Sequence, residues 1–99
     1  CGETAGVLLE YRAKLVELIY SSGIGCFKGM LCSADDASPA NSHAYAAWRI
    51  VRDLSRRVFE EEYVVDYARW QHRVRRVRQA ALDCYRESYQ PETAASLRL

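Results

Sequence analysis

No glycine or proline occurs between Ala40 and Gln90, so about half of this chain lacks the residues that most often interrupt a helix. Within this interval, apolar and aromatic residues recur every three or four positions: Tyr63, Tyr67, Trp70, Val74, Val77, Ala81, Cys84 and Tyr85. This spacing places them on one face of a helix. Residues 63–89 are therefore predicted to form an amphipathic helix.

One helix over the whole interval would expose its apolar face to water, so we expect a corner within it. Residues 60–66 fit best, because three glutamates meet the start of the new apolar stripe there and acids suit the first turn of a helix. The preceding helix is predicted over residues 39–62, capped by Ser38 with Pro39 at its first position. Its buried stripe is Ala44, Ala47, Trp48, Val51, Leu54 and Val58, with Phe59 beside it. Trp48 and Trp70 are both expected to fill the core.

A first helix is predicted over residues 4–22, with Thr4 as its cap and Gly23 in a left-handed position after its end. Its buried stripe is Val7, Leu8, Tyr11, Leu15, Leu18 and Ile19. Residues 23–38 hold three of the five glycines and show no sustained period, so they are predicted to be a long connection. Its apolar residues, Ile24, Phe27, Met30 and Leu31, should pack onto the core. Pro91 ends the third helix, and residues 90–99 form a tail.

These elements predict a single all-α domain, a small three-helix bundle with a long packed connection after the first helix. A chain of 99 residues suits one domain with a thin core. No apolar run approaches the length of about 18 residues that a membrane-spanning helix needs.

Charge is unevenly distributed, although the net charge is only +1. Residues 49–78 hold nine arginines against five acids, whereas residues 1–48 hold three basic residues against five acids. Arg69, Arg73 and Arg76 share one flank of the predicted third helix. Asp66 can reach Arg69, but no carboxylate lies three or four residues from Arg73 or Arg76. We therefore predict that these three arginines bind carboxylates or lipid phosphates of a partner bidentately.

Patterns of catalysis or of metal and cofactor binding are not apparent. His43 and His72 are read as surface residues, and neither lies within a helical turn of a cysteine. We therefore predict no enzyme, no cofactor and no metal. The isoelectric point of about 7.9 is below the strongly basic range typical of nucleic-acid binding, so we expect no nucleic acid.

The four cysteines, Cys1, Cys26, Cys32 and Cys84, leave two hypotheses open. Reduced, inert thiols are favoured, with Cys84 acting as a small apolar residue on the helix face. A free-standing secreted helical protein with disulfides is the alternative.

Two segments resemble the family of the 14 kDa subunit of the mitochondrial cytochrome bc1 complex. The first runs from Tyr20-Ser21-Ser22-Gly23-Ile24 through Lys28-Gly29-Met30-Leu31 to Asp35-Asp36. The second is Arg73-Val74-Arg75-Arg76-Val77-Arg78-Gln79-Ala80, followed by Pro91. The resemblance implies a non-catalytic accessory subunit of complex III, peripheral on the matrix side of the inner membrane, with cytochrome b as a neighbour.

A second resemblance, to the LYR-motif family, starts from Val7-Leu8-Leu9-Glu10-Tyr11-Arg12. Phe59-Glu60-Glu61, Tyr85-Arg86 and Gln90-Pro91 resemble the complex I member of that family. This resemblance implies a three-helix bundle that binds acyl carrier protein in complex I or in iron–sulfur assembly. Tyr11, Arg12 and Phe59 would then be the carrier-binding residues.

Overall fold

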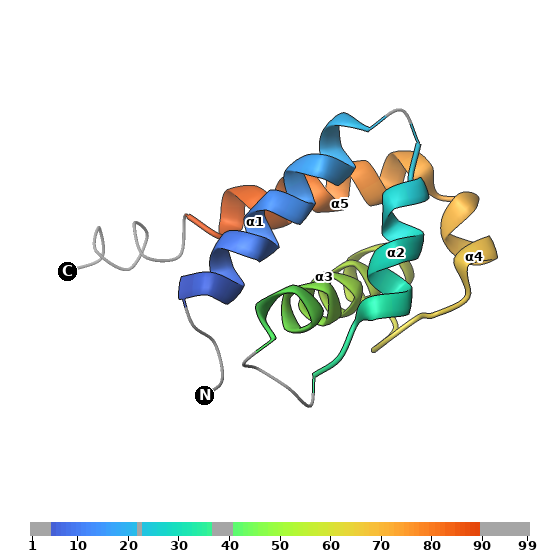
Figure 1. The fold of residues 1–99 in the computed structure, drawn as a ribbon. Helices are drawn as coiled ribbons and strands as arrows, with labels where there is room; N and C mark the ends of the chain where they lie inside the picture. Colours follow the sequence, from blue (N-terminus) through green and yellow to red (C-terminus); the bar gives the residue numbers. More distant parts are fainter. Residues whose placement is uncertain (1–4, 22, 37–40, 90–99) are drawn as a thin grey trace.

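The computed structural model of this protein describes residues 5–21, 23–36 and 41–89. These residues form five helices and no strand: α1 (Ala5–Tyr20), α2 (Gly25–Ser33), α3 (Ser42–Phe59), α4 (Tyr67–Gln71) and α5 (Val74–Glu87) (Figure 1). The all-α prediction is confirmed. The three longer helices, α1, α3 and α5, form the bundle, and α2 and α4 are short additions to it.

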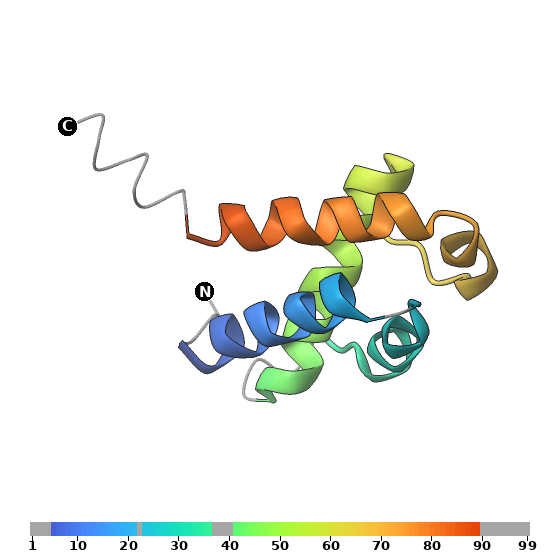
Figure 2. The ribbon, with the colours of Figure 1, turned by 90° about the horizontal axis from the view of Figure 1, so that it is seen from above.

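Helices α1 and α5 lie side by side, and α3 crosses both of them (Figure 2). They are antiparallel, because Arg12 of α1 contacts Ser88 after the end of α5 while Arg78 of α5 contacts Ser21 after the end of α1. α2 packs mainly on α3. The molecule is therefore two layers deep, with the α1–α5 pair on one side of α3.

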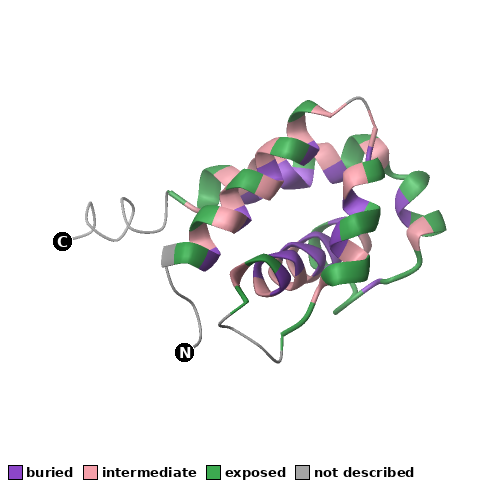
Figure 3. Ribbon diagram, viewed as in Figure 1, coloured by how far each residue is buried: buried purple, intermediate pink, exposed green. Residues whose placement is uncertain are grey.

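The core lies where the inward faces of these helices meet (Figure 3). α1 buries Val7, Tyr11, Leu15 and Leu18, which follow at intervals of four, four and three residues. Leu8 and Ile19, predicted in the same stripe, are only partly buried. The predicted stripe of α3 is buried except at Trp48, and Trp70 is completely buried, as expected.

The prediction of a connection without helix over residues 23–38 is wrong, since α2 occupies most of it. Ile24, Phe27 and Met30 follow at intervals of three residues, and all three are buried. Gly25 and Gly29 lie on the exposed side. Tertiary burial of one face therefore outweighs the poor helix propensity of two glycines. Gly23 does not have the positive φ expected of it.

The single helix predicted over residues 63–89 is also wrong. Residues 63–66 have no regular secondary structure, and the helix that follows is interrupted at His72 and Arg73. The backbone of Val64 is held by two side chains: its N–H donates to Ser55 Oγ at 2.9 Å, and its carbonyl accepts from Trp70 Nε1 at 3.0 Å. Val64 is buried as a result, whereas Tyr63, placed on the apolar face by periodicity, is 36% exposed.

The corner predicted at residues 60–66 is confirmed, and α3 ends there at Phe59 rather than at residue 62. Glu60 stops the helix with a left-handed backbone, φ 58° and ψ 33°. At its other end, Asn41 caps α3, and its side chain accepts a hydrogen bond from the N–H of Ala44 at 3.2 Å. The predicted caps Thr4 and Ser38, together with Pro39, Pro91 and the tail at 90–99, lie outside the described residues.

Candidate functional site

Arg69, the first of the three predicted partner-binding arginines, is engaged within the protein. Its Nη1 donates to Glu61 Oε1 at 3.2 Å, its Nη2 contacts the other oxygen of that carboxylate, and its guanidinium lies 4.6 Å from the Phe59 ring centroid. These hydrogen bonds lower the pKa of Glu61 and raise the pKa of Arg69. Arg69 therefore ties α4 to the turn after α3.

Arg73 and Arg76 are exposed, and neither forms an ion pair with any residue in the described part of the chain. Arg73 lies in the turn between α4 and α5, and Arg76 lies on the side of α5 that faces α3. Arg76 borders a hollow of about 160 Å³, which is lined by Arg57, Arg76, Gln79, Ala80 and Asp83. Because the helix is interrupted between Arg69 and Arg76, the predicted single flank of three arginines is wrong, and two arginines remain available.

Tyr11 lies at a polar cleft of about 570 Å³ between α1, α3 and α5. Its hydroxyl donates to Asp53 Oδ2 at 2.7 Å, and the guanidinium of Arg49 lies 4.6 Å from its ring centroid. Burial, with the Asp53 carboxylate adding to it, raises the pKa of Tyr11 well above its ordinary value. The cleft is lined by Leu8, Tyr11, Arg49, Asp53, Arg56, Arg57, Cys84, Glu87 and Ser88.

Arg12 of α1 and Arg78 of α5 each bind a backbone carbonyl just after the end of the other helix. We call this pair of contacts the arginine clasp. Arg12 donates through Nη2 to the Ser88 carbonyl at 2.8 Å and through Nε to Ser88 Oγ at 3.1 Å. Arg78 donates through Nη2 to the Ser21 carbonyl at 2.6 Å. Each arginine thus places a positive charge at the C-terminal end of the other helix, where the helix dipole favours it. Arg12 also lies 3.7 Å from the Tyr89 ring centroid.

Phe59 belongs to a separate aromatic cluster around Trp70. The Phe59 and Phe27 rings lie 4.8 Å and 4.6 Å from the Trp70 ring, both in edge-on geometry. No described contact joins Phe59 to Tyr11 or Arg12. The structure therefore brings Tyr11 and Arg12 together near the end of α5 but leaves Phe59 in another group of contacts.

The three described cysteines, Cys26, Cys32 and Cys84, are all unpaired. Cys84 lies in the core, as predicted, and burial raises the pKa of its thiol to about 11. His43 is exposed, and its Nδ1 lies 2.8 Å from Glu10 Oε2. Across residues 5–21, 23–36 and 41–89, no three His, Cys, Asp or Glu side chains are grouped so that they could hold a metal ion.

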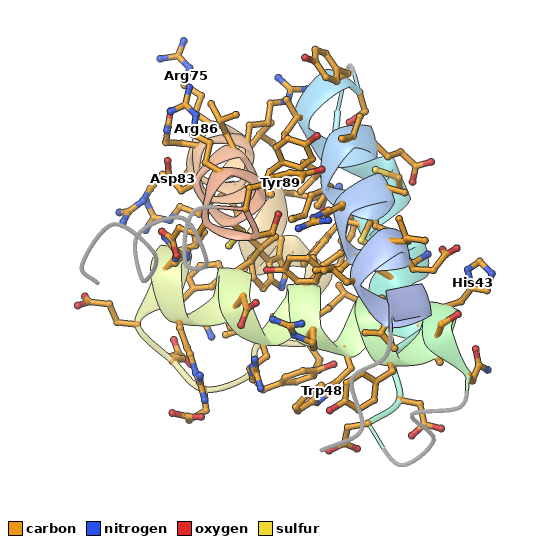
Figure 4. The ribbon with its side chains drawn as sticks, turned by 90° about the vertical axis from the view of Figure 1, so that its left-hand side faces the viewer. His43, Trp48, Arg75, Asp83, Arg86 and Tyr89 are labelled. Atoms are coloured by element: carbon orange, nitrogen blue, oxygen red, sulfur yellow. The ribbon has the colours of Figure 1, made fainter. Side chains whose placement is uncertain are left out.

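Several contacts escaped sequence reasoning because they join residues far apart in the chain. Asp53 binds Tyr11, and Ser88 binds Arg12. Trp48 is a separate case: it was expected in the core, but it lies half-buried at the surface of α3 (Figure 4). Within the same helix, the Tyr45 ring lies 5.5 Å away in a tilted geometry, and the Arg52 guanidinium lies 4.8 Å from the Trp48 ring centroid. The alternation of arginines and aromatics was the available signal for such stacking, but periodicity alone does not show which arginines stack.

A comparison with known protein families, with curated proteins and with solved structures found no match to this chain. None of the helices in the described segments is long and apolar enough to cross a membrane.

Proposed function

We propose that this protein is a non-catalytic accessory subunit of a mitochondrial respiratory-chain complex, which docks through arginines at the start of α5. The resemblance of residues 20–36 and 73–80 to the complex III family makes that complex the first choice. Cytochrome b is then the expected neighbour, and the site of docking is the matrix side of the inner membrane.

The observation that carries this proposal is the contrast between two groups of arginines. Arg56, Arg57 and Arg69 pair with Glu62, Glu87 and Glu61. Arg73 and Arg76, in contrast, are exposed, with no carboxylate partner among the residues that the structure describes. A guanidinium without an internal partner can bind a carboxylate of another subunit bidentately, which gives both strength and orientation. An acidic patch on a neighbouring subunit is therefore the partner that this region fits.

Co-purification after mild detergent extraction tests the proposal. The chain should be recovered with cytochrome b, and replacing Arg73 and Arg76 together by Gln should remove it from the complex. If the arginines are desolvated at the interface, the loss amounts to about 2–5 kcal/mol per arginine, mostly from the partner charge left unpaired.

The matched control is Arg56→Gln, because Arg56 is also exposed but pairs with Glu62. This control should stay assembled. Recovery of the wild-type chain as a lone monomer, or full assembly of the Arg73→Gln/Arg76→Gln variant, would contradict the proposal. Far-UV circular dichroism of each variant separates lost docking from lost folding.

An LYR-type subunit that binds acyl carrier protein is the second candidate. It is favoured by one observation: the cleft at Tyr11 is open, and its arginines, Arg49, Arg56 and Arg57, outnumber its acids, Asp53 and Glu87. Recovery with a phosphopantetheine-bearing carrier instead of cytochrome b would support this candidate. Phe59, the third residue of that resemblance, packs away from the cleft, so Phe59→Leu would leave carrier binding intact if the cleft alone is used.

A further inference from the structure

The outward sides of α1 and α5 together form a surface that the predicted docking arginines do not use. On α1 it consists of Leu9, Ala13, Val16 and Tyr20, which follow at intervals of four, three and four residues. On α5 it consists of Arg75, Leu82 and Arg86, spaced by seven and four, with Tyr89 two residues beyond the end of the helix. Arg12, Arg78 and Tyr85 lie along the seam between the two rows. We call this surface the α1–α5 outer face.

Exposed apolar side chains concentrate on this face. Leu9 is 66% exposed, Tyr20 82% and Tyr89 48%, and they make up three of the five large apolar side chains exposed in the described chain. The remaining two, Tyr63 and Val65, lie in the turn after α3. A large apolar side chain exposed at this level is ordinary when single, whereas a group of them on one face indicates a binding surface.

All the charges on the α1–α5 outer face are positive. Four arginines, Arg12, Arg75, Arg78 and Arg86, lie on it, and the nearest acid on α1 is the exposed Glu17, which borders it beside Val16. The nearest acid on α5, Asp83, lies on the side of that helix away from α1 and accepts a hydrogen bond from Gln79 at 3.0 Å (Figure 4). Glu87 is turned to α3, where it pairs with Arg57. The charge of this face therefore favours an anionic partner.

Tyr89 is held in place at the edge of the face. The Arg12 guanidinium lies over one side of its ring, and the Tyr85 ring meets it at 5.4 Å in edge-on geometry. Arg75, Arg86 and Tyr89 all lie on the side of the molecule opposite to Trp48 (Figure 4). Tyrosine has an apolar ring and a polar hydroxyl, which suits it to the boundary between lipid chains and headgroups.

We propose that the α1–α5 outer face binds the surface of a bilayer that contains anionic phospholipids. Leu9, Val16 and Tyr20 enter the boundary of the acyl chains, and Arg75 and Arg86 bind headgroup phosphates. A bilayer is favoured because anionic headgroups complement the arginines of this face, and Tyr20 and Tyr89 suit the boundary between headgroups and acyl chains. This inference does not depend on Arg73 and Arg76.

Co-sedimentation with vesicles tests the proposal. The chain should sediment with phosphatidylcholine vesicles that contain about 30 mol% phosphatidylglycerol, and not with pure phosphatidylcholine, and raising the salt to about 0.5 M should weaken binding. Because each arginine near an anionic surface contributes a factor of about five, the Arg75→Gln/Arg86→Gln variant should bind about 20- to 30-fold more weakly.

Leu9→Gln/Tyr20→Gln should also weaken vesicle binding, by about tenfold or more. The chain offers a control for each pair. Val65 is 65% exposed against 66% for Leu9, but it lies in the turn after α3, so Val65→Gln should bind as the wild type does. Lys28→Gln removes an exposed cation of α2, outside this face, and should also retain vesicle binding.

Three results would overturn the proposal: no sedimentation with anionic vesicles, an equal loss in the Val65 control, or a dimer in solution that Leu9→Gln/Tyr20→Gln abolishes. The last would make the face an interface between two copies. In the first case, if Leu9→Gln/Tyr20→Gln is lost from the respiratory complex, the face contacts an acidic protein and not a bilayer. The two proposals fail separately, because docking is tested by co-purification of the Arg73→Gln/Arg76→Gln variant and the outer face by vesicle binding of the other two double variants.

Discussion

Ser55 is the one polar side chain that is completely buried among the described residues, and its hydroxyl has two partners. It donates to the Val51 carbonyl at 2.6 Å within α3 and accepts the N–H of Val64 at 2.9 Å. The residue thus satisfies a backbone group of the segment between α3 and α4 that helix hydrogen bonds cannot reach. A small polar residue in the middle of an apolar stripe therefore decides where the chain turns.

Ser55→Ala should destabilise the protein by about 1–3 kcal/mol, because it leaves the buried Val64 N–H without a partner. Urea denaturation followed by circular dichroism measures the change. Ser33→Ala is a suitable control, since Ser33 Oγ bonds the Gly29 carbonyl on an exposed side of α2. Equal midpoints for Ser55→Ala and the wild type would show that water or another group can replace the hydroxyl.

Glu60 is the one residue with positive φ among those described, and no glycine shares this property. Side chains other than that of glycine are disfavoured there by about 1–2 kcal/mol. Glu60→Gly should therefore stabilise the protein by about 0.5–1 kcal/mol. Ala13→Gly, at an exposed position inside α1, should instead destabilise it by about 1 kcal/mol. The two midpoints in urea should move in opposite directions, and a loss of stability in both variants would contradict the assignment of strain to Glu60.

At the scale of elements, the arginine clasp explains how two amphipathic helices are held in register. Apolar contacts between α1 and α5 are tolerant of sliding, but Arg12 and Arg78 bind fixed carbonyls at opposite ends of the helix pair. Both bonds involve a charged donor and are partly buried, so each should contribute more than an ordinary surface hydrogen bond.

Arg12→Gln and Arg78→Gln should each reduce the free energy of unfolding by about 1–2 kcal/mol. Since the two arginines share no partner, their effects should add to within about 0.5 kcal/mol in the double variant. Arg86→Gln removes an arginine of α5 that has no described partner, and it should change stability by less than about 0.5 kcal/mol. A strong departure from additivity in this cycle would mean that the two ends of the helix pair open together.

At the scale of the whole molecule, the core carries two ionisable groups that must stay neutral. Tyr11 and Cys84 are both buried, and burial raises the pKa of each, that of Cys84 to about 11. In the unfolded chain a cysteine thiol has a pKa of about 8.5. The contribution of the neutral Cys84 thiol to stability is therefore fully present below that pH. It is lost as the pH rises towards 11, because the unfolded state then releases a proton that the folded state retains.

Between about pH 8 and pH 10, the wild type should lose about 2 kcal/mol of stability through Cys84. Cys84→Ala should be less stable at pH 7, since it leaves a small cavity, but its stability should fall less steeply over this range. Urea denaturation at several pH values measures both slopes. Parallel slopes for the two proteins would show that folding does not raise the pKa of the Cys84 thiol.

Apolar periodicity and the clustered glutamates determined much of this protein from sequence. The buried stripes of α1 and α3, the burial of Trp70 and Cys84, and the corner after α3 all follow from apolar spacing and the clustered glutamates. These features depend on neighbours within one or two turns of helix, so the local sequence contains the information. Local sequence also indicated an arginine-rich third segment, although not which arginines pair.

Only the tertiary structure decided the rest. Gly25–Ser33 became helical because α3 offered an apolar surface to Phe27 and Met30. Residues 63–66 left the helix where Ser55 and Trp70 hold the backbone of Val64. Arg69 is paired with Glu61, and Arg12 and Arg78 donate hydrogen bonds to carbonyls far away in the sequence. Each of these outcomes depends on a contact between residues far apart in sequence or on burial in three dimensions, and a pattern that repeats every three or four residues cannot encode either.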